Sequence, residues 1–460
     1  MYTSPLNQWF EKQKATGVCL IGLGVSHKEL LALFLEKGIP VVVRDRSTEI
    51  PQQEEFAQMG AKFILGENYL DNLTDAVIFR SPGMYFHHPK LTEARLRGQL
   101  ITSELEMFFD LCPAPIYGIT GSDGKTTTSS IIAEMLKESG RKVHLGGNIG
   151  RPLLSQIEQI SPEDAVVVEL SSFQLISMRS SPKVAVITNV TPNHLDVHGT
   201  MEEYVNAKKN IFLHQHGGTR TILNLDNAQT ASFFPEVRDE PRGFSRQAVP
   251  QKGTFISEKG MLMMNTGTEE IPLFPQEDIR IPGIHNVENY LAACAALFGE
   301  VSPQVMAKVA REFSGVEHRI EFVLEKDGVK YYNDAIATSP TRTAAGLASF
   351  SEKVILIAGG YDKQIPYTPL GEPICEKVKT LILCGQTAPK IQEAVISAPS
   401  YRAGYPEVAF AETFPEAIQM AEKMAKAGDI VLFSPASASF DQYKNFEEKG
   451  RHFKSLVKGL

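Results

Sequence analysis

A ten-residue segment, residues 119–128 (ITGSDGKTTT), constrains this chain more than any other. The apolar run at residues 114–118 is typical of a buried strand, and SSIIAEMLKESG follows with apolar residues at helical spacing and a terminating glycine. A strand, a glycine-bearing loop and a helix N-terminus direct backbone N–H groups and the helix dipole toward an anion. Lys125 adds a mobile positive charge, and Thr126 adds a hydroxyl suited to Mg²⁺. The segment therefore predicts an ATP phosphate site.

The spacing departs from the GxxxxGK[ST] motif, because Ile119 stands where the first glycine belongs. The alternative is a chance GKT sequence at a tight turn. The strand before and the helix after favour a phosphate loop. The loop residues predicted to contact ATP are Gly121, Ser122, Asp123, Gly124, Lys125, Thr126 and Thr127.

An earlier strand–loop–helix–strand pattern covers residues 18–45 and is of the nucleotide-binding type. Its glycine loop has Gly22 and Gly24 but His27 in place of a third glycine, which makes a dinucleotide the less favoured ligand. Asp45 and Arg46 follow the second strand, where a ribose, base or phosphate would be met. A second strand-end loop, SPG at residues 81–83, is expected beside the same crevice.

Composition excludes several classes of function. The chain has 460 residues, too many for one hydrophobic core, and its formal net charge of −8 argues against a nucleic-acid-binding protein. No apolar run reaches the roughly 20 residues of a membrane span, and the N-terminal residues lack a signal-peptide layout. Five scattered cysteines without CxxC spacing predict reduced thiols. We therefore expect a cytoplasmic protein with neither a nucleic-acid nor a membrane partner.

Polar residues follow several apolar runs in the central segment, on the carboxyl side where parallel sheets bind ligands. They are Asn148, Glu169 with Ser171, and residues 189–196 with His194. Alone, such a Glu is more often a cap and such a His is more often solvated. Together, beside a phosphate loop, they favour a metal–nucleotide site. Lys208 and Lys209 lie on a predicted helix, where a solvated face is the simpler interpretation.

The third part of the chain again alternates apolar strands with helices. The predicted fold class is α/β, with three domains that are each a mostly parallel, doubly wound sheet. We expect a Rossmann-like domain at 1–112, a P-loop-type ATPase domain at 113–316 and a second Rossmann-like domain at 317–460. Residues 230–280 are expected to be an insertion of short strands, and the C-terminal segment to be too polar for a core helix.

Seven motifs along nearly the whole chain resemble those of the Mur ligases, the ATP-dependent amide-forming enzymes of peptidoglycan precursor assembly. They are TGSDGKTTT, ELSSFQL, NVTPNHLD, YVNAK, GIHNVENYLAA, GVEHRIE and AGGYDK. The stretch SPASASFDQYKNFEEKG is similar to the signature of the members that add D-glutamate to UDP-N-acetylmuramoyl-L-alanine. The resemblance implies these two substrates, ATP and two Mg²⁺ ions, and we expect a monomer.

The resemblance also implies roles for individual residues. Lys208 falls on the family's carbamylated lysine, whose carbamate presents oxygens to Mg²⁺ as a Glu would. Lys125, His194 and Lys208 are the implied catalytic residues, and Thr126, Glu169, His194 and Lys208 the implied metal ligands. Adenine, phosphate and ribose of ATP would also be met by Asn286, Arg319 and Asp334. The UDP-sugar would be met by Gly22, Leu23, Gly24, Asp45, Arg46, Ser81, Pro82, Gly83, Asn148 and Ser171. D-glutamate would be met by Thr338, Lys363, Ser439, Phe440 and Phe446.

The implied reaction proceeds through an acyl phosphate made from ATP and the acceptor carboxylate. One alternative is another carboxylate–amine ligase, such as a folylpolyglutamate synthase, which should lack the UDP-binding first domain. A second is a non-catalytic nucleotide-sensing protein, against which Lys125, Glu169, His194 and Lys208 together argue. Two departures from the family pattern are Ile336, where some members carry lysine, and Asp123, where others carry Asn.

Overall fold

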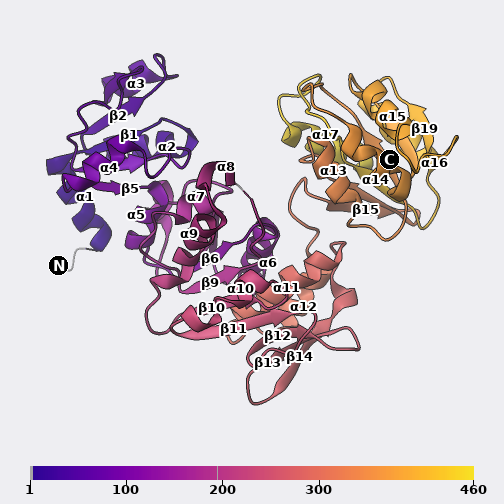
Figure 1. The fold of residues 1–460 in the computed structure, drawn as a ribbon, viewed down its shortest axis with the longest axis horizontal. Coiled ribbons are helices and arrows are strands. Elements are labelled where there is room, and N and C mark those ends of the chain that lie inside the picture. Colours follow the sequence, from indigo (N-terminus) through magenta and orange to yellow (C-terminus); the bar gives the residue numbers. More distant parts are fainter. Residues whose placement is uncertain (1–3, 194) are drawn as a thin grey trace. The chain divides into compact units, whose positions relative to one another are not determined.

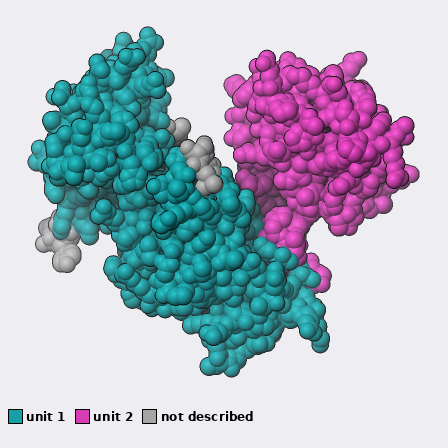
Figure 2. Space-filling model, viewed as in Figure 1, with its two compact units in different colours: residues 1–276, 288–309 teal, residues 277–287, 310–460 magenta. Residues whose placement is uncertain are grey.

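The chain forms two compact units, shown in Figure 2. A computed structural model describes residues 4–193 and 195–460. The first unit holds the described residues of 1–276 together with 288–309, and the second holds 277–287 and 310–460. Within the described residues, no helix is long and apolar enough to cross a membrane.

The first sheet, formed by the N-terminal part of the chain (indigo in Figure 1), is parallel throughout, and its strand order is β3-β2-β1-β4-β5. Its strands are β1 Val18–Ile21, β2 Val41–Asp45, β3 Lys62–Leu65, β4 Val77–Arg80 and β5 Leu100–Thr102. Its helices are α1 Pro5–Thr16, α2 Val25–Glu36, α3 Gln53–Gln58, α4 Pro89–Leu96 and α5 Glu104–Leu111. The strand order reverses between β1 and β4, and the carboxyl ends of strands at such a switch point are where sheets of this type bind ligands.

The second sheet has nine strands in the order β14-β13-β12-β11-β10-β9-β6-β8-β7. These are β6 Ile116–Thr120, β7 Val143–Gly147, β8 Ala165–Glu169, β9 Val184–Ile187, β10 Arg220–Asn224, β11 Glu240–Ser245, β12 Gly253–Ile256, β13 Met261–Asn265 and β14 Glu270–Pro275. The strands from β7 to β12 pair in parallel, and β6 and β8 are buried at every position, as central strands with both faces covered should be.

Register brings the carboxyl ends of four central strands together. Ile119 pairs with Glu169 across β6 and β8, and Glu169 pairs with Gly147 across β8 and β7. Thr120 pairs with Ile187 across β6 and β9. The residues that follow these strands therefore share one edge of the sheet.

The helices of the central segment are α6 Lys125–Glu138, α7 Ser172–Leu175, α8 Leu195–His198, α9 Met201–Leu213, α10 Ala228–Ala231, α11 Ile284–Leu297 and α12 Pro303–Glu312. Three short 3₁₀ helices are η1 Leu154–Gln159, η2 Phe234–Glu236 and η3 Gln276–Asp278. Thr200 is the N-cap of α9, and its hydroxyl accepts a hydrogen bond from the Glu203 N–H at 3.1 Å. This N-cap sets the start of the helix that carries Lys208.

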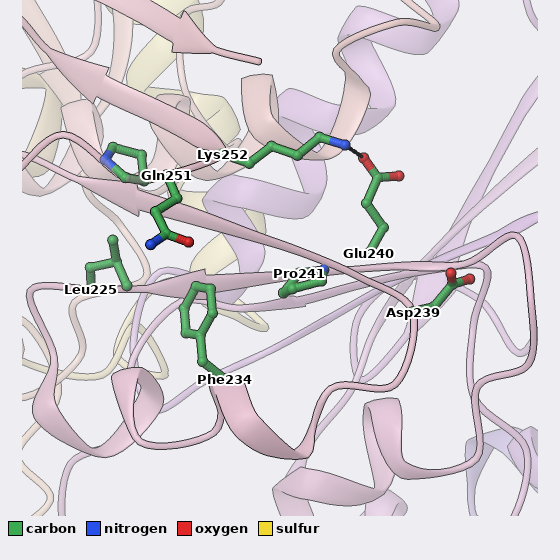
Figure 3. Close-up of a pocket in the computed structure, with 8 residues that line it drawn as sticks. Leu225, Phe234, Asp239, Glu240, Pro241, Gln251 and Lys252 are labelled. Atoms are coloured by element: carbon green, nitrogen blue, oxygen red, sulfur yellow. Dashed lines mark ion pairs between the residues drawn. The ribbon is translucent and has the colours of Figure 1, made fainter. Parts of the chain in front are cut away.

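The prediction that residues 230–280 form an insertion is wrong, because β11 and β12 continue the central sheet in parallel and β13 and β14 close it with antiparallel pairs. Close approach of two glycines allows this: a Cβ on Gly253 would lie 1.8 Å from the Gly243 carbonyl oxygen. A pocket of about 780 Å³ lies beside these strands, with Lys252 and Glu240 forming an ion pair at its rim (Figure 3). None of the predicted site residues lines this pocket.

The third sheet has the order β15-β16-β20-β17-β18-β19 and is parallel except for the β15–β16 hairpin. Its strands are β15 Glu321–Lys326, β16 Val329–Asn333, β17 Val354–Ala358, β18 Val378–Leu383, β19 Glu407–Phe410 and β20 Ile430–Phe433. Its helices are α13 Pro340–Leu347, α14 Thr368–Lys377, α15 Ala388–Ile396, α16 Phe414–Met424 and α17 Phe446–Lys458. The hairpin turns at Asp327 and Gly328 (φ 53° and 75°), as their sequence predicted.

The prediction that the C-terminal segment is too polar for a core helix is wrong for residues 446–458. Residues 446–458 form α17, and its Phe453 and Val457 are buried in one cluster with Phe414 and Phe433. Most polar residues of the helix lie on the other face, but Lys449 is buried with this cluster. The α/β class with three mostly parallel sheets is confirmed, and the domain boundaries at 112 and 316 stay predictions.

Candidate active site

The phosphate loop is held by glycines that have no room for a side chain. Gly121 adopts φ 155°, and a Cβ there would lie 1.9 Å from the Thr188 hydroxyl oxygen. Gly124 adopts φ 79°, and a Cβ there would lie 2.5 Å from Oδ1 of Asn289. Both positions thus require glycine for conformation and for space.

The segment after β9 braces the loop with hydrogen bonds. The N–H groups of Ser122 and Asp123 donate to the carbonyl oxygen and to Oδ1 of Asn189, both at 2.9 Å. The Thr188 hydroxyl donates to the Asp123 carbonyl at 2.5 Å. Asn189 belongs to the segment 189–196 that the sequence placed at this edge, whereas Thr188 is a neighbour of the loop that the sequence did not indicate. Their position directly after a strand beside the phosphate-loop strand was the available signal.

Two lysines converge on one loop carbonyl. The Lys125 ammonium donates to the carbonyls of Gly121 and Ser122, at 3.0 and 2.8 Å. Lys208, from α9, donates to the same Gly121 carbonyl at 2.8 Å. Since only 1% of Lys208 is exposed, the solvated-face interpretation of this residue is wrong.

Burial changes the chemistry of Lys208. Its Nζ lies 4.8 Å from the ring centroid of Tyr204, whose hydroxyl is 2.9 Å from that of Ser122. Burial, and secondarily the charge of Lys125, lowers the pKa of Lys208 from 10.5 to about 7. A substantial share of this side chain is therefore a neutral, nucleophilic amine near neutral pH.

Glu169 ends β8 on the same edge and is 1% exposed. Its Oε1 accepts a hydrogen bond from the Asn148 amide at 2.8 Å. Its Oε2 is buried and has no hydrogen-bond partner among the described residues. A buried carboxylate oxygen without a donor is the kind of ligand that Mg²⁺ takes, so the residue fits a metal.

The other predicted metal ligands are less defined. His194 lies outside the described residues, and Thr126 is half-buried in the first turn of α6. Within the described part of the chain, no three His, Cys, Asp or Glu residues gather as a metal site. Lys208 would fit beside a cation only once its own positive charge is removed.

Asp45 connects the strand-end loops of the first sheet. Its carboxylate accepts hydrogen bonds from the N–H groups of Leu23 and Ser47, both at 2.8 Å, and so ties the glycine loop to the end of β2. Gly22 has φ 79°, and a Cβ there would lie 3.1 Å from the Ser81 hydroxyl oxygen, which places the two strand-end loops side by side. Arg46 is exposed beside them.

His27 fills the position of the third glycine with a structural role. The side chain is buried, and its Nδ1 lies 2.7 Å from the Gly22 carbonyl oxygen. Burial lowers the pKa of His27 to about 4, so the imidazole is neutral at neutral pH and Nδ1–H donates to that carbonyl. The histidine thus stabilises the conformation of the glycine loop.

Arg80 joins the first sheet to the central one. This buried side chain donates to the Phe173 carbonyl in α7 at 3.2 Å. It also donates to the hydroxyl of Ser177, which follows α7, at 2.6 Å. The predicted UDP-sugar residue Ser171 is the N-cap of α7 and forms a capping box with Gln174. A pocket of about 270 Å³ lies at this junction, lined by Arg80, Pro82, Gly83, Met84, Tyr85, Phe86, Phe173, Ile176, Val197 and His198.

In the second unit, Asp334 is buried at the end of β16. Its carboxylate accepts hydrogen bonds from the Ser434 hydroxyl at 2.7 Å and the Ile320 N–H at 3.2 Å. Burial raises its pKa to about 7. Arg319 is exposed and directly precedes Ile320 in the chain. Asn286 donates to the Pro282 carbonyl at 2.6 Å.

The predicted D-glutamate residues gather at the carboxyl edge of the third sheet. Lys363 follows β17, and its Nζ contacts the carbonyl and hydroxyl oxygens of Thr338 at 3.2 and 3.4 Å. Ser439 is buried after β20, and the neighbouring Phe440 is 63% exposed, with its ring 6.0 Å from that of Tyr361. Phe446 starts α17.

Comparison with known proteins decides the family. Residues 119–297 match the Mur ligase middle domain, and residues 318–437 match the Mur ligase glutamate ligase domain. The chain is 51% identical to the UDP-N-acetylmuramoylalanine–D-glutamate ligase of Acetivibrio thermocellus and 45% identical to that of Ruminiclostridium cellulolyticum. Each alignment covers 99% of both chains. The chain belongs to the Mur ligase family.

The fold of this Mur ligase agrees with that of a solved relative. The UDP-N-acetylmuramate–alanine ligase of Thermotoga maritima superposes with a TM-score of 0.56 at 17% identity, over 96% of this chain and 99% of that one. In the Mur ligase described here, the phosphate loop, Glu169 and Lys208 lie at one sheet edge. The roles of individual site residues stay predictions.

Proposed function

We propose that this Mur ligase uses ATP to join D-glutamate to UDP-N-acetylmuramoyl-L-alanine in peptidoglycan precursor synthesis. The observation that carries the proposal is the full-length identity of up to 51% to relatives named for this activity. The convergence of Lys125 and Lys208 on the Gly121 carbonyl, beside the buried Glu169, supports it chemically. Because the reaction consumes ATP, we also propose that the enzyme is cytoplasmic. We further propose that it is a monomer.

In the first proposed step, the acceptor carboxylate attacks the γ-phosphorus of ATP and ADP leaves, which forms an acyl phosphate. Lys125 offsets the charge that spreads over the phosphoryl oxygens, and the backbone N–H groups at the start of α6 orient them. Asn286, Arg319 and Asp334 would contact the nucleotide. In the second step, the D-glutamate amine attacks the acyl carbon, loses a proton and expels phosphate, leaving the amide.

Magnesium fits the residues on the central sheet edge. The buried Oε2 of Glu169, the Thr126 hydroxyl, His194 and a carbamate on Lys208 would hold it. When bound, Mg²⁺ would neutralise phosphate charge. We propose the carbamate because a lysine with a pKa of about 7 is partly a free amine that can add CO₂, and the product is anionic.

The test is a phosphate-release assay of the full chain with ATP, Mg²⁺ and UDP-N-acetylmuramoyl-L-alanine, offered D-glutamate, L-glutamate, L-lysine and glycine in turn. We expect turnover with D-glutamate only. Preference for another amino acid would reassign the activity within the family. UDP should compete with the UDP-sugar in the same assay, whereas NAD should not. Competition by NAD alone would overturn the assignment of the first-sheet crevice.

A further inference from the structure

Lys449 is a buried lysine that the proposed reaction leaves without a role. It lies on α17 and is 3% exposed. Its Nζ donates to the carbonyl oxygen of Gly359 at 3.1 Å. Within the part of the chain that the structure describes, no carboxylate forms an ion pair with it. Burying an ammonium in this way normally reduces the stability of the fold. A role in function would explain why a lysine occupies this position.

Three aromatic rings surround the ammonium, and the Asp441 carboxylate attracts it from beyond ion-pair distance. The Lys449 ammonium lies 5.2 Å from the ring centroid of Phe414, 5.6 Å from that of Phe433 and 6.0 Å from that of Tyr443. Cation–π attraction to these three rings keeps the charge tolerable inside the second unit. The side chain is therefore directed to one carbonyl, that of Gly359.

That carbonyl belongs to the loop that carries Lys363. The loop is packed against the segment after β20: the N–H of Gly359 donates to the Pro435 carbonyl and that of Tyr361 to the Ala438 carbonyl, both at 2.9 Å. A Cβ on Gly360 would lie 2.3 Å from the Ala438 oxygen and 3.3 Å from the Lys449 ammonium. The two loops are thus in direct contact with each other next to the Lys449 ammonium.

We propose that Lys449 is a positioning residue for the amino-acid substrate, which holds the Lys363 loop in register with the Ser439–Phe440 segment. The inference rests on the proposed function, because these two loops carry the predicted D-glutamate residues. A shift of about 1 Å between such groups is enough to reduce turnover substantially. Lys449 acts through the backbone and does not itself touch the substrate.

Lys449→Met tests the proposal, since Met is apolar and of similar length. We expect the apparent KM for D-glutamate to rise at least tenfold, while the KM for ATP and for the UDP-sugar stays within threefold of the parent. The melting temperature should stay the same or increase, because a buried charge has been removed. Lys449→Arg, which keeps both the charge and the donor, should return the KM for D-glutamate to within threefold of the parent.

Lys458→Met, at an exposed position of the same helix, is the matched control and should match the parent in every measurement. A KM for D-glutamate within threefold of the parent in Lys449→Met would overturn the proposal. So would a Met variant that unfolds or loses affinity for all three substrates together, because that pattern marks a purely structural residue. If the parent itself does not use D-glutamate, the proposed function fails first, and the two failures are distinguished.

Discussion

Lys125 and Lys208 donate hydrogen bonds to the same acceptor, the carbonyl oxygen of Gly121, at 3.0 and 2.8 Å. One lysine comes from the helix that follows the phosphate loop and the other from α9, more than 80 residues later. Lys208 is almost fully buried, and burial lowers its pKa to about 7. Lys125, in the first turn of α6, is the residue that we propose contacts the phosphates of ATP.

Replacing Lys125 with Met should abolish most of the activity while the fold is kept. The change removes the charge that stabilises the phosphoryl-transfer transition state, and loss of one such group reduces kcat by about 10²–10³-fold. Steady-state phosphate release and the melting temperature measure the two effects. Lys137→Met at the other end of α6, where the exposed ion pair with Glu134 contributes little, is the control. Activity within a few-fold of the parent would contradict the role of Lys125.

Replacing Lys208 with Ala should remove most activity, and short carboxylic acids should restore part of it. Their carboxylate can stand where the proposed carbamate presents its oxygens. The parent should also lose activity when CO₂ is removed from the buffer. Lys209→Ala, next to it on α9 and paired with Glu236 at 2.5 Å, should remain active without any additive. Indifference of the Lys208 variant and the parent to both treatments would exclude the carbamate.

The lowered pKa of Lys208 should also be visible in the stability of the protein. Between pH 7 and 10.5 the unfolded state binds the Lys208 proton more fully than the folded state does. The free energy of unfolding should therefore rise with pH in this window, by up to about 1.4 kcal/mol per pH unit for this residue. Urea unfolding in CO₂-free buffer at pH 7, 8 and 9 should show this rise in the parent relative to Lys208→Met. Equal slopes for both proteins would refute the shift.

Replacing Glu169 with Gln should weaken the response to Mg²⁺. The Gln side chain keeps a similar shape and can still accept a hydrogen bond from Asn148, but it carries no negative charge. We expect the Mg²⁺ concentration for half-maximal activity to increase at least tenfold, measured by titration after treatment with EDTA. Glu163→Gln, an exposed carboxylate in the turn before β8, should leave the titration unchanged. A normal titration for Glu169→Gln would remove the residue from the metal site.

Replacing Lys363 with Met should affect D-glutamate alone. D-glutamate has two carboxylates, and with Ile336 unable to donate from its side chain, Lys363 is expected to provide much of the charge pairing. Truncating one partner of such a pair loses about 2–5 kcal/mol, so the KM for D-glutamate should rise at least tenfold while the KM for ATP stays the same. Lys423→Met, exposed on α16, is the comparison. An unchanged KM for D-glutamate would place the substrate carboxylates elsewhere.

The sequence by itself determined the alternation of strands and helices, the strand–loop–helix unit at residues 116–138 and the family. These features depend on short-range patterns: apolar runs with glycine breaks, helical spacing after residue 124, and the Asp327–Gly328 turn. The motifs also placed Glu169 after a strand and Lys208 on a helix. They did not indicate that the lysine is buried, since a lysine in an amphipathic helix is usually exposed.

Only the tertiary structure decided which distant residues share a site. Thr188 and Asn289 surround the glycines of the phosphate loop because strand pairing and helix packing bring together segments far apart in the sequence. Residues 240–256 joined the central sheet because Gly243 and Gly253 allow two backbones to touch, a contact that no local pattern encodes. Burial lowers the pKa of Lys208 and of Lys449, and burial results from the packing of the whole chain. Helix and strand propensity depends on residues that are neighbours in the sequence. Desolvation and tertiary contacts depend on which distant segments the fold packs against a residue.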